Sequence, residues 1–128
     1  MVTPELRREL HYGNRVVACF ADRPPHVHAM LAAAVAARPE AEALVCDDRR
    51  LAYGDFDAEV RAHAAGLAAR GVGQGDRVAL LLGNGLEFPI LTYAVARLGA
   101  VLVPLSVRDQ TPGLRHALTN SGARVLIA

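Results

Sequence analysis

The sequence predicts an α/β fold with a parallel sheet, because strand-like and helix-like segments alternate through its second half. Residues 78–82 and 101–105 are continuous apolar runs, as expected for parallel strands covered on both faces. A helical pattern follows each run, and right-handed crossovers are expected to connect the strands. Hydrophobic residues make up 52% of the 128-residue chain, which is enough to form one core.

The first half predicts two amphipathic helices with a β-hairpin between them. Apolar residues recur at helical spacing from Val27 to Val35, and this helix ends before Pro39. Residues 43–46 and 51–53 are strand-like and flank a polar turn, which predicts the N-terminal β-hairpin of the domain. The second helix runs from Phe56 toward Arg70. Before residue 25, the sequence predicts a short helix over Thr3–His11 and then an irregular stretch.

The second half predicts three strands and two helices. After the strand 78–82, Asn84 and Glu87 have the spacing of a capping box, so a helix is expected from Asn84 to Leu98, with Gly99 as its stop. The strand 101–105 follows, then a helix that starts at Thr111–Pro112, then a strand from Val125. We expect residues 1–24 to be an extension and residues 25–128 to be one partial domain.

Composition excludes several classes of protein. The net charge is +1 and the charges are dispersed, so no nucleic-acid partner or anionic membrane surface is indicated. All 14 basic residues are Arg, which excludes a Walker-type phosphate loop or a Schiff-base lysine within this chain. Only Ser106 and Ser121 are serines, and neither lies in a nucleophile elbow.

The cysteines and the apolar run 88–105 indicate a cytoplasmic protein without a membrane span. Cys19 and Cys46 are too few and too far apart for a disulfide scaffold or a metal cluster, so they are expected to be reduced packing residues. The first residues lack the apolar centre of a signal peptide. Arg97 interrupts the apolar run, which favours a helix followed by a buried strand.

One glycine motif has the position of a nucleotide-binding turn. Gly83-Asn84-Gly85 lies between a strand and a helix, where backbone N–H groups can approach a pyrophosphate. However, Phe88 stands at the third glycine position, and Asp109 is a late candidate for the acidic residue expected about 20 positions on. The motif is therefore either a helix-capping turn, which we favour, or a phosphate-binding turn. Gly71-Val72-Gly73-Gln74-Gly75 precedes a strand and is interpreted as a connector.

The titratable residues form no recognisable catalytic pattern. His26 and His28 are two residues apart at a helix start, without an acidic or thiol ligand at metal-binding spacing. His63 is on an apolar helix face and is interpreted as a hydrogen-bonded core residue. His11 and His116 are isolated and suggest no catalytic triad. The acids at the start of the second helix are better explained by the favourable helix dipole than by an acid–base pair; they are Asp55, Asp57 and Glu59.

Residues 37–128 resemble the N-terminal end of the adenylate-forming ligase superfamily, and most closely its acyl-CoA synthetases. The landmark motifs are Leu51-Ala52-Tyr53, Gly71-Val72-Gly73, Gly75-Asp76-Arg77-Val78-Ala79, Asn84 with Glu87-Phe88, Leu98-Gly99-Ala100-Val101, Val103-Pro104-Leu105 and Ser121-Gly122-Ala123-Arg124. Three positions depart from the common pattern: Ala52 stands for Thr, Gly83 for Pro and Ser106 for Asn.

The resemblance implies a full-length enzyme that uses ATP, Mg²⁺ and coenzyme A. Such an enzyme activates a carboxylic acid to an acyl-adenylate and then transfers the acyl group to the thiol of coenzyme A. In the family, the phosphate loop, the segment near the adenine, the ribose-binding Asp and the late Lys lie beyond the matched region. No catalytic, cofactor-binding or metal-binding residue is therefore assigned in this chain, and the chain itself is expected to bind no cofactor.

The resemblance also implies that this chain is a fragment that is inactive alone. Its last strand begins at Val125 and should leave an open sheet edge, so we expect self-association. Two alternatives remain open: a small nucleotide-binding module that uses Gly83–Gly85, and a non-catalytic subunit of a ligase whose remainder is a separate chain. The sequence does not indicate which acid is the substrate.

Overall fold

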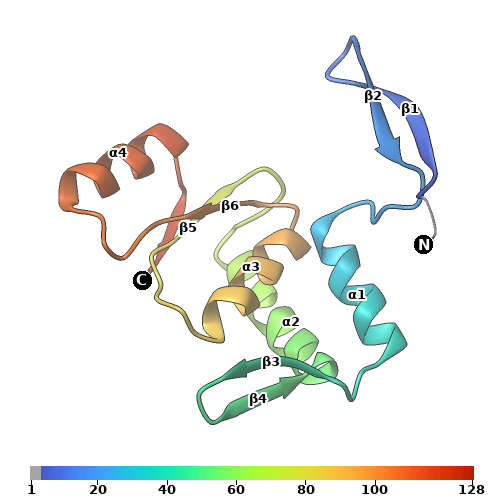
Figure 1. Ribbon diagram of the computed structural model, residues 1–128. Coiled ribbons are helices and arrows are strands. Elements are labelled where there is room, and N and C mark those ends of the chain that lie inside the picture. Colours follow the sequence, from blue (N-terminus) through green and yellow to red (C-terminus); the bar gives the residue numbers. More distant parts are fainter. Residues whose placement is uncertain (1–3) are drawn as a thin grey trace.

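The computed structural model describes residues 4–128, which form seven strands and four helices (Figure 1). In chain order they are β1 (Leu6–His11), β2 (Arg15–Phe20), α1 (Val27–Ala37), β3 (Glu42–Cys46), β4 (Arg49–Ala52), α2 (Tyr53–Ala69), β5 (Arg77–Leu80), α3 (Glu87–Arg97), β6 (Val101–Pro104), α4 (Thr111–Ser121) and β7 (Val125–Ile127).

The predicted parallel sheet is confirmed, and β5 is its central strand. The strand order is β6-β5-β7, with both neighbours parallel to β5. Helix α3 connects β5 to β6, and α4 connects β6 to β7. Val78, Ala79 and Leu80 are completely buried, because β5 is paired on both edges and covered on both faces. The continuous apolar run in the sequence reflects this position.

The core lies where α1, α2 and α3 meet one face of β5. Buried side chains are contributed by all three helices, by β5 and by the loops on either side of it: Leu31, Phe56, Val60, Ala64, Leu67, Val72, Val78, Leu80, Leu86, Ile90, Leu91, Ala94 and Val95. Phe56 of α2 and Tyr93 of α3 meet edge to face, with ring centroids 5.5 Å apart. Helix α4 lies apart from α1–α3 in Figure 1 and contributes no fully buried residue.

The hairpin predicted between the first two helices is also confirmed. Strands β3 and β4 are antiparallel, and the register shifts between Glu42 and Leu44. The turn is shorter than predicted, because Arg49 and Arg50 already belong to β4 and only Asp47 and Asp48 remain between the strands. Asp47 has φ 51°, a left-handed conformation that Asp tolerates better than most residues.

The helix predicted over Thr3–His11 is wrong, and this segment is the first strand of a second hairpin. Thr3 itself lies outside the described residues. Strands β1 and β2 are antiparallel, with Leu6 opposite Phe20 and Leu10 opposite Val16. Leu6 and Leu10 are four residues apart, a spacing that lies on one face of either a helix or a strand. The strand is favoured because Leu6 and Leu10 lie opposite the apolar residues Phe20 and Val16 of β2.

The capping box predicted at Asn84 is wrong as well. Helix α3 begins at Glu87, its N-cap position is Leu86, and no side chain caps it. Residues 81–86 form a loop instead. The predicted stop at Gly99 is confirmed, since Gly99 follows α3 with φ 66°, and Gly122, with φ 60°, ends α4 in the same way.

Candidate functional site

Two landmark motifs, one with Asp76 and Arg77 and one with Arg124, are hydrogen-bonded to each other next to the sheet, and we call this contact the joint. The carboxylate of Asp76 accepts hydrogen bonds from the backbone N–H of Gly73, at 2.8 Å, and from Arg124 Nη1, at 3.0 Å. The bond from Gly73 and the Arg124 charge lower the pKa of Asp76, so the carboxylate is ionised near neutral pH. This joint connects the loop before β5 to the start of β7, 48 residues further along the chain.

Arg77 joins the same two motifs from the first position of β5. Its guanidinium donates to the carbonyl oxygens of Ser121, at 2.9 Å, and Gly122, at 3.0 Å, and also to that of Gly75. Ser121 and Gly122 are the last residues of α4 and its C-cap, where carbonyl groups are free and a cation is favourable. Asp76, Arg77 and Arg124 therefore have a structural task, which is to hold α4 and β7 against β5.

An apolar groove of about 610 Å³ lies beside β7. It is lined by side chains of α2, Leu91 of α3 and the last four residues: Ala62, His63, Gly66, Leu67, Arg70, Leu91, Val125, Leu126, Ile127 and Ala128. In the described part of the chain, no strand pairs with the outer edge of β7. The groove can therefore accept further apolar side chains together with a further strand.

The Gly83–Gly85 loop lies beside a smaller cavity of about 420 Å³, formed with the turn between β3 and β4. The Glu87 side chain folds back toward this loop, and a Cβ added at Gly85 would lie 2.8 Å from Glu87 Oε2. A hydrogen bond from its own backbone N–H, and then Arg49 at 3.0 Å, lower the pKa of Glu87. An ionised carboxylate thus lies at the N-terminus of α3, where a phosphate would have to bind, so the geometry disfavours a phosphate-binding turn; the favoured alternative, a helix-capping turn, is not formed either, because no side chain caps α3.

The second glycine motif is confirmed as a connector between α2 and β5. Gly71 and Gly75 both have φ near +80°, and Gly73 binds Asp76. The acids at the start of α2 also have simple partners. Asp57 forms an ion pair with Arg61 one turn later, at 3.0 Å.

The histidines are dispersed over three helices and the first hairpin. His26 caps α1, with Nδ1 accepting from the backbone N–H of Ala29, and its ring lies parallel to that of His28. His28 is half-buried and its Nε2 accepts from Arg97 of α3, at 2.8 Å. His63 is hydrogen-bonded to the Glu59 carbonyl, as expected, but 41% of its side chain is exposed. The prediction that His63 is a core residue is therefore wrong, because it lies at the rim of the groove beside β7.

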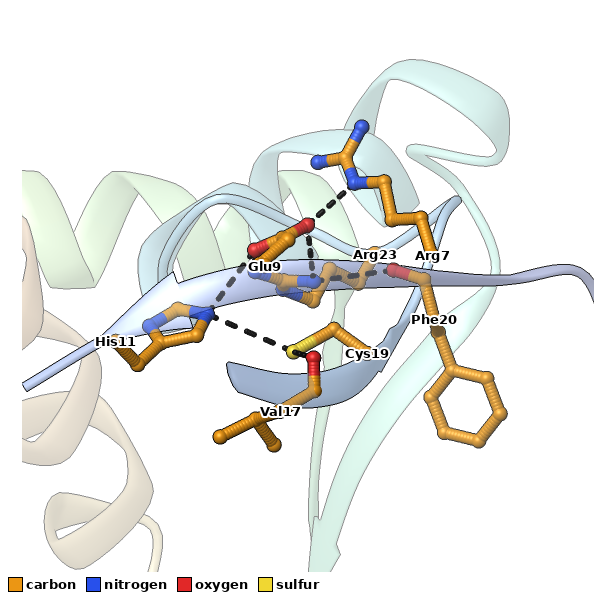
Figure 2. A network of polar contacts seen from close by, with 7 residues as sticks. All are labelled: Arg7, Glu9, His11, Val17, Cys19, Phe20 and Arg23. Carbon is orange, nitrogen blue, oxygen red and sulfur yellow. Dashed lines mark hydrogen bonds and ion pairs between the residues drawn. The ribbon is translucent and has the colours of Figure 1, made fainter. Parts of the chain in front are cut away.

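The structure brings together three residues that the sequence left apart. Figure 2 shows Glu9 and His11 of β1 next to Cys19 of β2. His11 Nε2 lies 3.0 Å from Glu9 Oε2 and 3.5 Å from Cys19 Sγ. Sequence reasoning missed this cluster because it assigned residues 3–11 to a helix. The available signal was the turn dipeptide Gly13-Asn14 followed by the apolar, β-branched run from Val16 to Phe20.

Comparison with known proteins explains the landmark motifs. The family model of the AMP-binding enzymes matches residues 31–128, which is most of the chain. This chain belongs to the AMP-binding enzyme family. Among curated relatives of this AMP-binding family member is the long-chain-fatty-acid–CoA ligase FadD13 of Mycobacterium tuberculosis, 40% identical over 95 residues. The match covers 74% of the chain and 19% of that ligase.

Solved structures of the same family share the fold of this AMP-binding family member. The N-terminal domain of FACL13 from Mycobacterium tuberculosis has a TM-score of 0.76 and 37% identity, covering 79% of this chain and 26% of that domain. The N-terminal subdomain of NpsA from Klebsiella oxytoca has a TM-score of 0.77 and 28% identity, covering 80% of this chain and 27% of that subdomain. The expected fold, part of an N-terminal subdomain of an adenylate-forming enzyme, is thereby confirmed.

The AMP-binding family member described here spans about a fifth of the length of the first curated relatives it matches. Within residues 4–128, no helix is both long and apolar enough to cross a membrane.

Proposed function

We propose that this chain provides the N-terminal scaffold of an ATP-dependent acid–CoA ligase and has no ligase activity alone. The observation that carries the proposal is the joint of Asp76, Arg77 and Arg124. These three landmark residues bind each other and the backbone, and thereby fix α4 and β7 on the sheet. In this proposal residues 25–128 are the partial adenylation domain and residues 1–24 are an extension.

The groove beside β7 supports this proposal. Val125 and Ile127 are only partly buried although they pack against the core, and the groove between them and α2 is apolar. Burying such a surface stabilises a domain by about 25 cal/mol for each Å² removed from water. We infer that the part of a ligase that follows the matched segment in the relatives packs here, either in the same chain or as a separate chain.

The reaction that the complete ligase performs consists of two steps. A carboxylic acid attacks the α-phosphate of ATP to give an acyl-adenylate and pyrophosphate, and the thiol of coenzyme A then displaces AMP. The name of the FadD13 relative suggests fatty acids as the acid class and fatty acid metabolism as the context. The first step needs cationic groups and Mg²⁺ to stabilise charge on the α-phosphate and on the leaving pyrophosphate, and this chain contains no Lys to contribute. We therefore place the binding sites for Mg²⁺, ATP and coenzyme A in the remainder of the enzyme. We also propose that the enzyme is cytoplasmic.

A chimera tests the scaffold role. The segment of FadD13 that matches this chain is replaced by residues 31–128, and ATP-dependent acyl-CoA formation is measured with long-chain fatty acids. The chimera should remain active, since the exchanged part only supports the site. A control chimera with Val78→Asp, which buries an unpaired charge in β5, should be inactive and insoluble. A folded but inactive chimera would contradict the scaffold role.

The isolated 128-residue chain gives a second test. It should release no pyrophosphate from ATP with any fatty or aromatic acid, and measurable turnover would exclude the proposal. Adding the FadD13 portion that lacks the matching segment as a separate chain distinguishes the two forms of the proposal. Activity restored by mixing indicates a split ligase, whereas activity in the chimera alone indicates that both parts must belong to one chain.

A further inference from the structure

Three side chains of metal-binding type converge on the hairpin β1-β2. They are the carboxylate of Glu9, the imidazole of His11 and the thiol of Cys19 (Figure 2), and one ligand atom from each lies within 4.8 Å of the others. All three residues are partly buried. The hairpin precedes residue 31, where the match to the AMP-binding family begins, so the cluster is no part of the scaffold described above.

The hairpin brings these residues together through the alternation of its strands. Side chains two residues apart in a strand point to the same face, so Glu9 and His11 lie on one face of β1 together with Arg7. Cys19 is the direct partner of Arg7 across the hairpin and shares this face. The opposite face carries Leu6, Leu10, Val16 and Phe20 together with Ala18 and Arg8, so it is the more apolar of the two faces.

The spacing of the ligand atoms fits a tetrahedral ion. With the usual Zn²⁺ bond lengths to N, O and S, neighbouring ligand atoms in a tetrahedral site lie about 3.3 to 3.6 Å apart. Here His11 Nε2 lies 3.0 Å from Glu9 Oε2 and 3.5 Å from Cys19 Sγ. The ligand atoms of Glu9 and Cys19 lie within 4.8 Å of each other, a separation that side-chain rotation can adjust to an ion between the three atoms.

We propose that Glu9, His11 and Cys19 form a binding site for a divalent transition-metal ion of the Zn²⁺ type, with the fourth position open to water or another ligand. A thiolate and an imidazole select such ions over Mg²⁺ and Ca²⁺, which prefer oxygen ligands. Binding requires the His11 proton on Nδ1 and releases the thiol proton of Cys19 to solvent.

Two arginines surround the carboxylate and hold it in place. Arg7 contacts Oε1 of Glu9, and Arg23 spans the carboxylate, with Nη1 3.0 Å from Oε1 and Nη2 2.5 Å from Oε2. These contacts lower the pKa of Glu9 to about 2, so the carboxylate is ionised as a metal ligand must be. The ion replaces the contacts of His11 Nε2 with Glu9 Oε2 and with Cys19 Sγ, while Arg7 and Arg23 keep their contacts with the carboxylate and orient it. The positive charges of the two arginines repel the ion, so the site binds it more weakly than the same ligands would in uncharged surroundings.

Cobalt and zinc titrations of the full 128-residue chain test the proposal. Co²⁺ should give the near-ultraviolet charge-transfer band of a cobalt–thiolate bond, and Zn²⁺ should abolish it by displacement. Cys19→Ser should abolish the band, and His11→Asn should weaken Zn²⁺ binding by at least about tenfold in calorimetry. Cys46→Ser is the matched control, because it removes the other free thiol and should change neither result.

Amide NMR spectra separate loss of the site from loss of the hairpin. Cross-strand contacts between Leu10 and Val16 report whether β1 and β2 still pair in each variant. The proposal predicts that these contacts persist in Cys19→Ser while Zn²⁺ no longer shifts the hairpin amides. It is overturned if the cobalt band is absent from the unmodified chain, persists in Cys19→Ser, or disappears in Cys46→Ser.

Discussion

His28 shows how one residue can make folding depend on pH. It lies on α1 and its Nε2 accepts a hydrogen bond from Arg97, while its Nδ1 is buried without a partner. Burial, and then the charge of Arg97, lower the pKa of His28 below the ordinary value of 6.5; Asp57 opposes this shift, and His26 adds a smaller lowering. The folded chain therefore holds this imidazole neutral, and Arg97 bonds to its free lone pair.

The sign of the effect follows from proton linkage. Around pH 6.5 the unfolded chain binds more protons at His28 than the folded chain, so the stability from this group is complete above 6.5 and is lost as pH falls below it. We expect the urea concentration at the unfolding midpoint to decrease when the pH is lowered from about 8 to about 5. In His28→Gln, which can still accept from Arg97 but does not titrate, the fall should be smaller.

The exposed His116 of α4 provides the control for this prediction. His116→Gln should leave the pH dependence of the urea midpoint as it is in the unmodified chain, since no neighbour depends on that ring. Equal pH profiles for His28→Gln and the unmodified chain would show that the contact with Arg97 does not control the protonation of His28.

At the scale of elements, the two glycines of α4 should respond in opposite ways to alanine. Gly122 ends the helix with φ 60°, where an L-residue costs about 1 kcal/mol, and a Cβ there would lie 3.2 Å from Arg77 Nη2. Gly113 is inside the helix, and its added Cβ would meet only Asp109, at 3.9 Å. Gly122→Ala should lower the free energy of unfolding by about 1 kcal/mol, and Gly113→Ala should raise it by about 0.5 kcal/mol.

Urea unfolding of the two variants checks this prediction, and each is the control for the other. Because both changes add one methyl group to the same helix, a difference in sign isolates the backbone conformation at the C-cap. Changes of the same sign would mean that the joint of Arg77 with Ser121 and Gly122 adapts to the new side chain, and that the cap contributes little to holding α4.

The elements that the sequence predicts correctly are those whose signal is local. The runs of β5 and β6 are apolar because both faces are buried, and the spacing of Phe56, Val60 and Leu67 shows one helix face directly. The failures need information from distant residues. Helix α3 begins at Glu87 and lacks its predicted cap at Asn84, and the carboxylate of Glu87 binds its own backbone N–H and Arg49, 38 residues earlier. Residues 6–11 form the strand β1 and not a helix because their apolar side chains pair with those of β2.

The same reasoning separates the predictable parts of the candidate sites from the rest. The landmark motifs around Asp76 and Arg124 identified the family from residue order alone, whereas their direct contact is a property of the folded sheet. The cluster of Glu9, His11 and Cys19 depends on the pairing of two strands that the sequence assigned to a helix and an irregular stretch. Ligand residues eight positions apart in sequence give no metal-binding pattern until that pairing is known.

At the scale of the whole molecule, the open side of the sheet determines how copies of the chain behave toward each other. In the described part of the chain, β7 is an edge strand whose central residue, Leu126, has 46% of its surface exposed. An unpaired edge of apolar residues next to an apolar groove is a template for pairing with a second chain. We therefore expect the 128-residue chain to self-associate through β7, and a lysine on that strand to oppose the pairing.

Sedimentation velocity over a range of concentrations tests this expectation. The sedimentation coefficient of the unmodified chain should increase with concentration, and Leu126→Lys should reduce that increase, because a charged residue on an edge strand opposes pairing with a second chain. Met30→Lys is the matched control, since Met30 is 53% exposed on α1 and loses a similar apolar surface far from the edge. An equal reduction in both variants would point to general hydrophobic association, and a monomer at every concentration would show that β7 and its groove need no partner. If only Leu126→Lys is effective, the surface where copies meet is also the surface where the proposed remainder of the ligase packs, so that adding this remainder should dissociate the copies.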